Sequence, residues 1–118
     1  MTKGPPFPEA HHVTGIHTRQ FLIASHIKPW AKFKEERLDP SNVICLSPLW
    51  DKAFDQGFVT FDAGDRTIRL AERIKDDDPQ LYAALGPFKG KKLHEPATAA
   101  PKSNFLAYHN HEIFLDGH

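Results

Sequence analysis

The stretch from Ser47 to Gly57, SPLWDKAFDQG, constrains the fold most, because it marks both ends of one short helix. A serine, which can accept a backbone hydrogen bond, precedes a proline whose fixed φ suits the first helical position. A glycine follows the last turn, where chains commonly leave a helix. Directly before this stretch, the apolar run VICL at residues 43–46 predicts a short strand. The centre of the chain is therefore a short strand that leads into a short helix.

The N-terminal side of this unit also has strand character. RQFLIASH at residues 19–26 contains β-branched and aromatic side chains, and TGIHT at residues 14–18 contains turn residues. Together they predict a hairpin across residues 12–26. Pro29 ends the strand, and residues 30–41 are predicted to form a loop that finishes in the turn sequence LDPSN.

The C-terminal half repeats these signals. FVTFD and RTIRLA flank the turn AGD and predict a second hairpin over residues 58–71. DPQLYAALG at residues 78–86 again has a cap, a proline and a closing glycine, which predicts another helix. Residues 86–103 are predicted to form a long loop, and the apolar spacing of residues 103–115 allows a final amphipathic helix. The sequence thus predicts an α+β fold without internal repeats.

Composition limits the size and the setting of this fold. A chain of 118 residues can bury the core of one modest domain. The prolines within the first ten residues predict a flexible tail over residues 1–12, which leaves residues 13–118 as the domain. The single cysteine, Cys45, excludes an intrachain disulfide, and its apolar surroundings predict a buried, inert thiol, as suits a reducing cytoplasm. No stretch is long and apolar enough to predict a membrane span.

Charge alone names no partner, because 15 basic residues balance 15 acidic ones. The charges are nevertheless clustered. One basic group follows the first predicted strand, a second lies near residue 90, and an acidic run covers residues 76–78; the basic residues are Lys28, Lys32, Lys34 and Arg37, then Lys89, Lys91 and Lys92. Each cluster taken alone is typical of a solvated loop.

Four polar residues in the central unit can carry chemistry. His26 ends the first predicted strand, and Asn42 stands in the turn before the next one. Asp51 and Asp55 are four positions apart on the predicted helix, so both carboxylates share one face. Two hard oxygen ligands favour Mg²⁺ completed by waters and a substrate phosphate. Considered alone, the pair is also compatible with two solvated helix acids.

A strand, a loop, a second strand and a short helix, with these residues in this order, resemble the ββα-metal finger of HNH endonucleases. FLIASHIKPW, followed by RLDPSNVICLSPLWDKAFDQGFVTFD, is similar to the HNH subfamily often found at the carboxyl end of restriction-type and other bacterial defence proteins. The resemblance covers residues 13–70 well, and FLAYHNHEIF near the C-terminus more loosely. It implies a ββα-metal (HNH) finger with its core motif at residues 19–61, an extra β-hairpin and C-terminal helices.

The resemblance also implies a role for each residue. His26 takes the place of the general base, and Asn42 either pins the loop that holds this histidine or joins the metal shell. Asp51 and Asp55 take the places of helix ligands, with Ser25 as a weak third ligand. These oxygen ligands imply Mg²⁺ or Mn²⁺ rather than Zn²⁺. The partner implied is DNA, gripped by the basic side chains of Lys28, Lys32, Lys34 and Arg37.

Departures from the family pattern keep alternatives open. Many relatives have an acidic residue or histidine where this chain has Ser25, and many have a histidine at or beside Trp50. The first hypothesis is a metal-dependent DNA endonuclease that acts in defence; the others are a catalytically degenerate binding module and a nuclease that acts on RNA. An upstream sensing or target-recognition domain, or a partner chain, is compatible with each hypothesis, whereas a membrane is not expected.

Several side chains have more than one interpretation. Trp30 either stacks on a base or sugar or packs beneath its loop, whereas Phe54, Phe58 and Phe61 are expected in the core. Three histidines near the N-terminus could bind zinc together, although without neighbouring thiolates they are also typical of exposed, non-ligating residues; they are His11, His12 and His17. His109 and His111 are expected to face different sides of a helix.

Overall fold

The structure, a computed structural model, describes residues 13–16, 18–28, 39–94 and 100–117. The predicted tail over residues 1–12 lies outside this part of the chain. So do several residues for which the sequence predicts roles: His11, His12, His17, Trp30, Lys32, Lys34 and Arg37. Within the described ranges, no helix is both long and apolar enough to cross a membrane.

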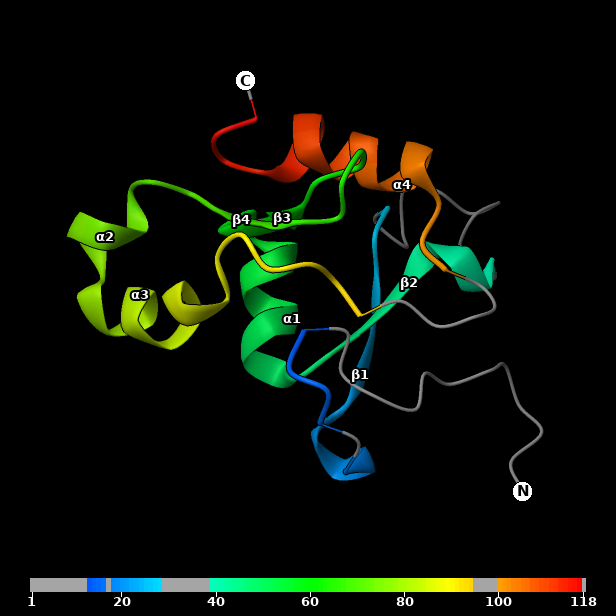
Figure 1. Ribbon diagram of the computed structural model, residues 1–118, viewed down its shortest axis with the longest axis horizontal. Coiled ribbons are helices and arrows are strands. Elements are labelled where there is room, and N and C mark those ends of the chain that lie inside the picture. Colours follow the sequence, from blue (N-terminus) through cyan, green and yellow to red (C-terminus); the bar gives the residue numbers. More distant parts are fainter. Residues whose placement is uncertain (1–12, 17, 29–38, 95–99, 118) are drawn as a thin grey trace.

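The first two strands form an antiparallel pair at the N-terminal side of the molecule (Figure 1). Strand β1 (Ile23–His26) pairs with β2 (Val43–Leu46), so that Ser25 lies opposite Ile44 and His26 opposite Val43. A 3₁₀ turn, η1 (Arg19–Phe21), precedes β1, and a second one, η2 (Pro40–Asn42), precedes β2.

The predicted hairpin across residues 12–26 is wrong. Among its described residues only the last four form a strand, and residues 19–21 are wound into η1, closed by a 2.9 Å bond from the Phe21 N–H to the Thr18 carbonyl. The partner that β1 takes is β2, whose Ile44, Cys45 and Leu46 are fully buried. Pairing with this apolar strand buries β1 more effectively than a polar neighbouring turn can.

Helix α1 (Pro48–Asp55) follows β2 and confirms the predicted capped helix. The Ser47 hydroxyl accepts a 3.5 Å bond from the Trp50 N–H, and Gly57 leaves the helix end at φ 84°. Trp50, Ala53 and Phe54 form the buried face of α1. Strands β1 and β2 together with α1 make the ββα unit that the sequence predicts.

The second predicted hairpin is also confirmed. Strand β3 (Val59–Phe61) pairs antiparallel with β4 (Ile68–Leu70), and Val59 lies opposite Leu70. Helix α3 (Pro79–Leu85) is capped by Asp78, whose carboxylate accepts a 3.1 Å bond from the Leu81 N–H. A short helix that the sequence analysis missed, α2 (Ile74–Asp77), precedes it, and the 3₁₀ turn η3 (Gly86–Phe88) follows it.

The C-terminal segment is helical, as predicted, but its winding changes midway. Helix α4 (Ser103–Tyr108) continues directly into a π-helical turn, η4 (His109–Ile113). Figure 1 shows this segment over the β3–β4 hairpin, with the hairpin between it and α1. The Leu115 N–H donates a 2.9 Å bond to the Gly57 carbonyl, which ties the end of the chain to the end of α1.

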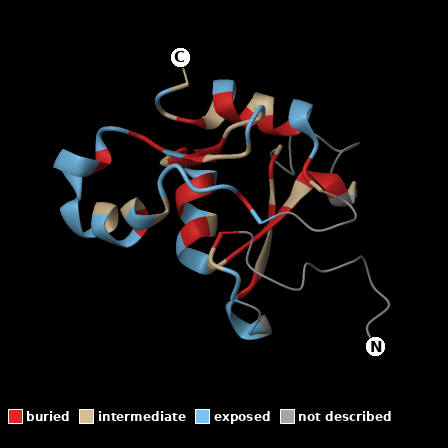
Figure 2. Cartoon of the chain, viewed as in Figure 1, coloured by how far each residue is buried: buried red, intermediate tan, exposed pale blue. Residues whose placement is uncertain are grey.

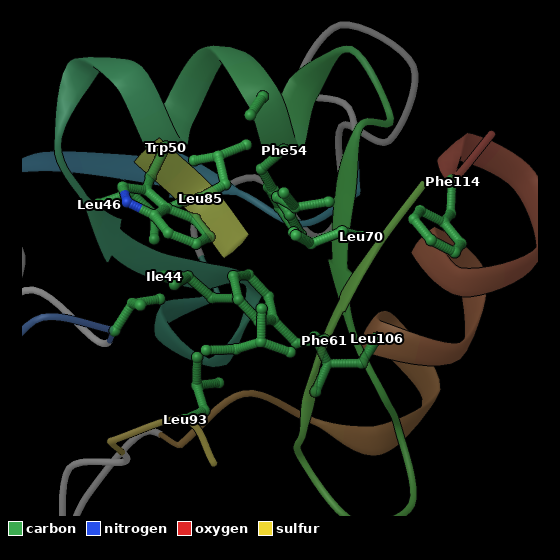
Figure 3. Packing of buried hydrophobic residues seen from close by; sticks show 14 of the residues in the cluster. Ile44, Leu46, Trp50, Phe54, Phe61, Leu70, Leu85, Leu93, Leu106 and Phe114 are labelled. Carbon is green, nitrogen blue, oxygen red and sulfur yellow. The ribbon is translucent and has the colours of Figure 1, made fainter. Parts of the chain in front are cut away.

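One hydrophobic core joins the ββα unit to the C-terminal elements. Figure 3 shows Trp50 and Phe54 of α1 with Ile44 and Leu46 of β2, while Phe61, Leu106 and Phe114 extend the cluster toward η4. Buried residues in Figure 2 accordingly follow the inner side of α1 and the strands, whereas α2 and α3 are largely exposed. This core fixes α1 against β1 and so determines the geometry of the site.

Candidate functional site

Ser25 and Asp51 meet between β1 and α1. The Ser25 hydroxyl donates a hydrogen bond of 2.5 Å to the Asp51 carboxylate. Ser25 is buried at 3% exposure, and Asp51 is half-buried in the first turn of α1. The structure therefore brings two of the three predicted metal-binding side chains together as a pair of adjacent oxygen donors.

His26 lies on the other face of the strand. Successive side chains of a strand point to opposite faces, and the burial alternates accordingly, because Ser25 and Ile27 are buried and His26 between them is only half-buried. Ser25 faces α1, so His26 projects away from it. A phosphate that meets both His26 and Asp51 would have to lie across the end of β1 rather than over one face.

Asn42 holds the backbone just beyond His26. Its side-chain oxygen accepts a 2.9 Å bond from the Lys28 N–H, and its amide nitrogen donates a longer bond of 3.5 Å to the Lys28 carbonyl. The Asn42 carbonyl also accepts from the Ile27 N–H at 2.9 Å, which extends the β1–β2 ladder by one residue. Asn42 is fully buried. These contacts are those of a residue that pins the loop, which is the first of the two roles that the family pattern offers.

Asp55 stands one turn beyond Asp51, at the last residue of α1, and is exposed. Among the described residues, no three His, Cys, Asp or Glu side chains gather as a potential metal cluster. Mg²⁺ does not need such a cluster, because it keeps several waters and is often held by one or two carboxylates together with phosphates. The Asp51 carboxylate with its adjacent hydroxyl, and Asp55 on the same helix face, fit this type of ion.

Two side chains near the site belong to the core. Trp50 is 3% exposed and meets the Phe88 ring edge-on, with ring centroids 5.6 Å apart. This side chain packs in the core and is not a metal ligand. Cys45 is fully buried on β2, and burial raises the pKa of its thiol to about 11. An uncharged thiol is a poor nucleophile and a poor metal ligand, as expected for an inert core cysteine.

Lys28 is the described member of the predicted phosphate-binding group. Its ammonium lies over two rings of α4, 5.5 Å from the centroid of Phe105 and 5.4 Å from that of Tyr108. The other predicted members, Lys32, Lys34 and Arg37, fall outside the described residues.

A buried network of polar side chains contacts the last turn of α1 and was not predicted from the sequence. His109 is 1% exposed, its Nε2 lies 2.8 Å from the Phe54 carbonyl, and its Nδ1 lies 2.7 Å from the Thr60 hydroxyl. Because a carbonyl only accepts, Nε2 carries the proton and Nδ1 accepts from Thr60. The Asn110 amide in turn donates to the Thr60 hydroxyl at 2.8 Å. The side chains of His109, Thr60 and Asn110 are thus each paired in this buried network.

This network holds the C-terminal end of α1, the helix that carries Asp51 and Asp55. The His109 ring also stacks on Phe54, with centroids 3.8 Å apart and planes at 5°. Burial lowers the pKa of His109 to about 4, so the ring is neutral at physiological pH. Its neighbour His111 is exposed, in line with the expectation that the two face different sides. No sequence signal marked His109, because its partners lie about fifty positions away.

Comparison with known proteins gives one family match. Residues 11–62 match the family model described as HNH endonuclease. The match contains β1, β2, α1 and β3, and with them Ser25, His26, Asn42, Asp51 and Asp55. No curated protein matches the chain.

Proposed function

Because residues 11–62 belong to the HNH endonuclease family, we propose that this domain is a metal-dependent endonuclease that hydrolyses DNA phosphodiester bonds. The observation that carries the proposal is the contact between Ser25 and Asp51 across β1 and α1, next to His26. This contact supports the proposal, because Ser25, its neighbour His26 and Asp51 all lie within the matched segment.

His26 is the proposed general base. Imidazole changes charge near neutral pH, so a histidine can take a proton from an attacking water without an extreme environment. Two features support the assignment: its position at the end of β1, and the bonds from Asn42 that hold the next two residues. Asn42 is accordingly proposed as the residue that fixes the backbone position of His26.

Asp51 and Asp55 are the proposed metal ligands, and Ser25 orients Asp51 through its hydroxyl. A bound Mg²⁺ or Mn²⁺ would supply positive charge to the phosphorane and to the departing 3′-oxygen. The two carboxylates would hold the ion on α1. This helix is packed through its buried face, and the bond from His109 to the Phe54 carbonyl holds its last turn. Softer Zn²⁺ fits this oxygen-only set less well.

DNA, rather than RNA, is the proposed substrate, and defence against foreign DNA in the cytoplasm is the proposed setting; both follow from the resemblance of the motif to restriction-type HNH domains. A second candidate function has one observation in its favour. Trp50 is packed in the core and Ser25 is a neutral residue, so the domain lacks two groups that many relatives carry. A binding module on a degenerate HNH scaffold would have these features.

One experiment separates these functions. Supercoiled plasmid and a structured RNA are each incubated with the protein in Mg²⁺ and in EDTA. We expect nicking of the plasmid in Mg²⁺ only, and we expect His26→Ala to lower the rate by about 10² to 10⁴ while folding and Mg²⁺ binding persist. The matched control is His94→Ala, which removes an exposed histidine outside the matched segment.

The possible results lead to different conclusions. Cleavage of RNA alone would change the substrate class, and binding without cleavage would favour the degenerate module. Turnover of His26→Ala at the rate of His94→Ala would remove His26 from the role of base.

A further inference from the structure

Helix α4 reaches the candidate site from outside the family-matched segment. The Lys102 N–H, just before α4, donates a 3.2 Å bond to the carbonyl of Ser41, the neighbour of Asn42 in η2. This backbone bond fixes the start of α4 beside the turn that pins the His26 loop. The family match over residues 11–62 gives no role to this helix.

Two ammonium groups from distant parts of the chain share one aromatic ring. Lys28 lies over Phe105 at 5.5 Å, and Lys102 lies over the same ring at 5.3 Å. Lys28 also lies 5.4 Å from the Tyr108 centroid. Ring faces attract cations and orient them without neutralising their charge. We call the side chains of Lys28, Lys102, Phe105 and Tyr108 the α4 surface.

Asp39 lies beside this surface and pairs with Lys102 without covering it. Asp39 accepts a 3.1 Å bond from Lys102 through one oxygen, and its other oxygen accepts from the N–H and the hydroxyl of Ser41. The Lys102 side chain remains 55% exposed. Counted over these three described side chains, Lys28, Lys102 and Asp39, the net charge is +1, and a phosphate can approach the exposed side of Lys102.

Lys28 brings the α4 surface close to the proposed base. It comes two positions after His26, and the residue between them is held by the bond from the Ile27 N–H to the Asn42 carbonyl. The Lys28 N–H is held in turn by the Asn42 side chain. The cations of the α4 surface therefore lie beside the end of β1, close to His26 along the chain.

We propose that the α4 surface is part of the nucleic-acid interface and binds a backbone phosphate of DNA next to the bond that is cut. Lys102 contacts the phosphate directly, and the rings of Phe105 and Tyr108 hold Lys28 in place for a second contact. This inference rests on the proposed nuclease function and adds to it a binding element that lies outside residues 11–62.

The test measures DNA binding in the His26→Ala background, where cleavage does not interfere. Fluorescence anisotropy with a labelled duplex gives the Kd at several salt concentrations. We expect Lys102→Gln to weaken binding several-fold at low salt and to reduce the slope of log K against log salt by about 0.9, the value for one phosphate contact. The matched control is Lys75→Gln, because Lys75 is exposed on α2, on the far side of the molecule from α4 (Figure 1).

A second pair of variants tests the ring. Tyr108→Leu removes a ring face beneath Lys28 and should weaken binding, whereas Tyr108→Phe keeps the face and should bind as the parent does. Equal Kd values and salt slopes for Lys102→Gln and Lys75→Gln, in a protein that binds DNA, would overturn the inference and leave the nuclease proposal intact. A parent protein that neither binds nor cuts DNA would overturn both.

Discussion

Asn42 holds the backbone beside the proposed general base. It is fully buried and bonded to both backbone polar groups of Lys28. Asn42→Ala leaves the Lys28 N–H without this acceptor, so we expect a loss of roughly 1 to 3 kcal/mol in the free energy of unfolding, together with slower cleavage. Urea unfolding followed by circular dichroism measures the first effect, and plasmid nicking measures the second.

The control for this variant is Asn104→Ala, which changes an exposed asparagine on α4. It should cost much less stability than Asn42→Ala. An Asn42→Ala protein as stable and as active as this control would show that the bonds to Lys28 have no part in holding His26.

His109 predicts how stability depends on pH. Its pKa is lowered from 6.5 to about 4, chiefly because burial penalises the charged ring. Well above pH 6.5 the ring is neutral in both the folded and the unfolded chain, so it does not make the free energy of unfolding depend on pH. Below pH 6.5 the unfolded chain takes up a proton that the folded chain refuses, and by pH 4 this costs roughly 3 kcal/mol.

His109→Gln tests this dependence, because glutamine offers an amide in place of the ring but has no titrating group. We expect the variant to be less stable at neutral pH and to lose less stability than the wild type between pH 6.5 and 4. Chemical unfolding at four or five pH values in this range measures the difference. Parallel stability curves for the two proteins would mean that His109 takes up its proton as easily in the folded state as in the unfolded one.

At the scale of elements, α1 carries two carboxylates in different environments. Asp51 is in the first turn, where the helix dipole favours a negative charge, and Asp55 is at the last residue, where the dipole opposes it. Without metal, Asp55→Asn should therefore stabilise the fold by roughly 0.3 to 1 kcal/mol. With Mg²⁺ the same change should lower stability, because it removes a ligand that only the folded state assembles.

Thermal melts of the wild type and Asp55→Asn, each in Mg²⁺ and in EDTA, measure both effects. Asp76→Asn on α2 provides a control for the removal of an exposed acid elsewhere. If Asp55→Asn changes the melting temperature equally in both conditions, Asp55 is an ordinary surface acid and does not bind the ion.

The elements that sequence predicts well are those whose signals are local. The helix from Pro48 and the helix from Pro79 each carry a capping side chain and a proline within a few residues, and both form as expected. The hairpin over β3 and β4 also has its turn between its strands. In these segments the residues that decide the structure are neighbours in the chain.

The elements that sequence predicts poorly depend on distant partners. β1 pairs with β2 across an intervening segment, so its local resemblance to a hairpin arm was misleading. The winding of η4 and the burial of His109 depend on Phe54 and Thr60 of other elements. Within the site, motif order pointed to Asp51, but its bond with Ser25 emerges only when α1 packs on β1.

At the scale of the whole molecule, the C-terminal segment closes the fold against α1 at Gly57. This residue has φ 84°, and an added Cβ would lie within 2.2 Å of the Ile113 carbonyl oxygen. Gly57→Ala must therefore displace η4 from the end of α1. We expect a marked loss in the free energy of unfolding, together with faster amide hydrogen exchange in the elements around His109.

Gly90→Ala is a matched control, since Gly90 has nearly the same φ, 82°, but nothing within 4 Å of an added Cβ. It should cost only the strain of a left-handed alanine, on the order of 1 kcal/mol. Urea unfolding of both variants isolates the steric part. Equal losses would mean that backbone strain alone, and not contact with η4, makes glycine necessary at position 57.

The packing of Cys45 gives this domain a built-in reporter of local opening around β2. The only thiol of the chain sits at 0% exposure on β2, opposite Ala24 of β1. Side chains project from the faces of a strand pair, so a thiol reagent reaches Cys45 only in molecules where the packing over its face has opened. The labelling rate then equals the intrinsic reactivity multiplied by the fraction open. Where the fraction open exceeds the fraction globally unfolded, labelling measures the free energy of local opening around the proposed catalytic strand, without altering a single residue.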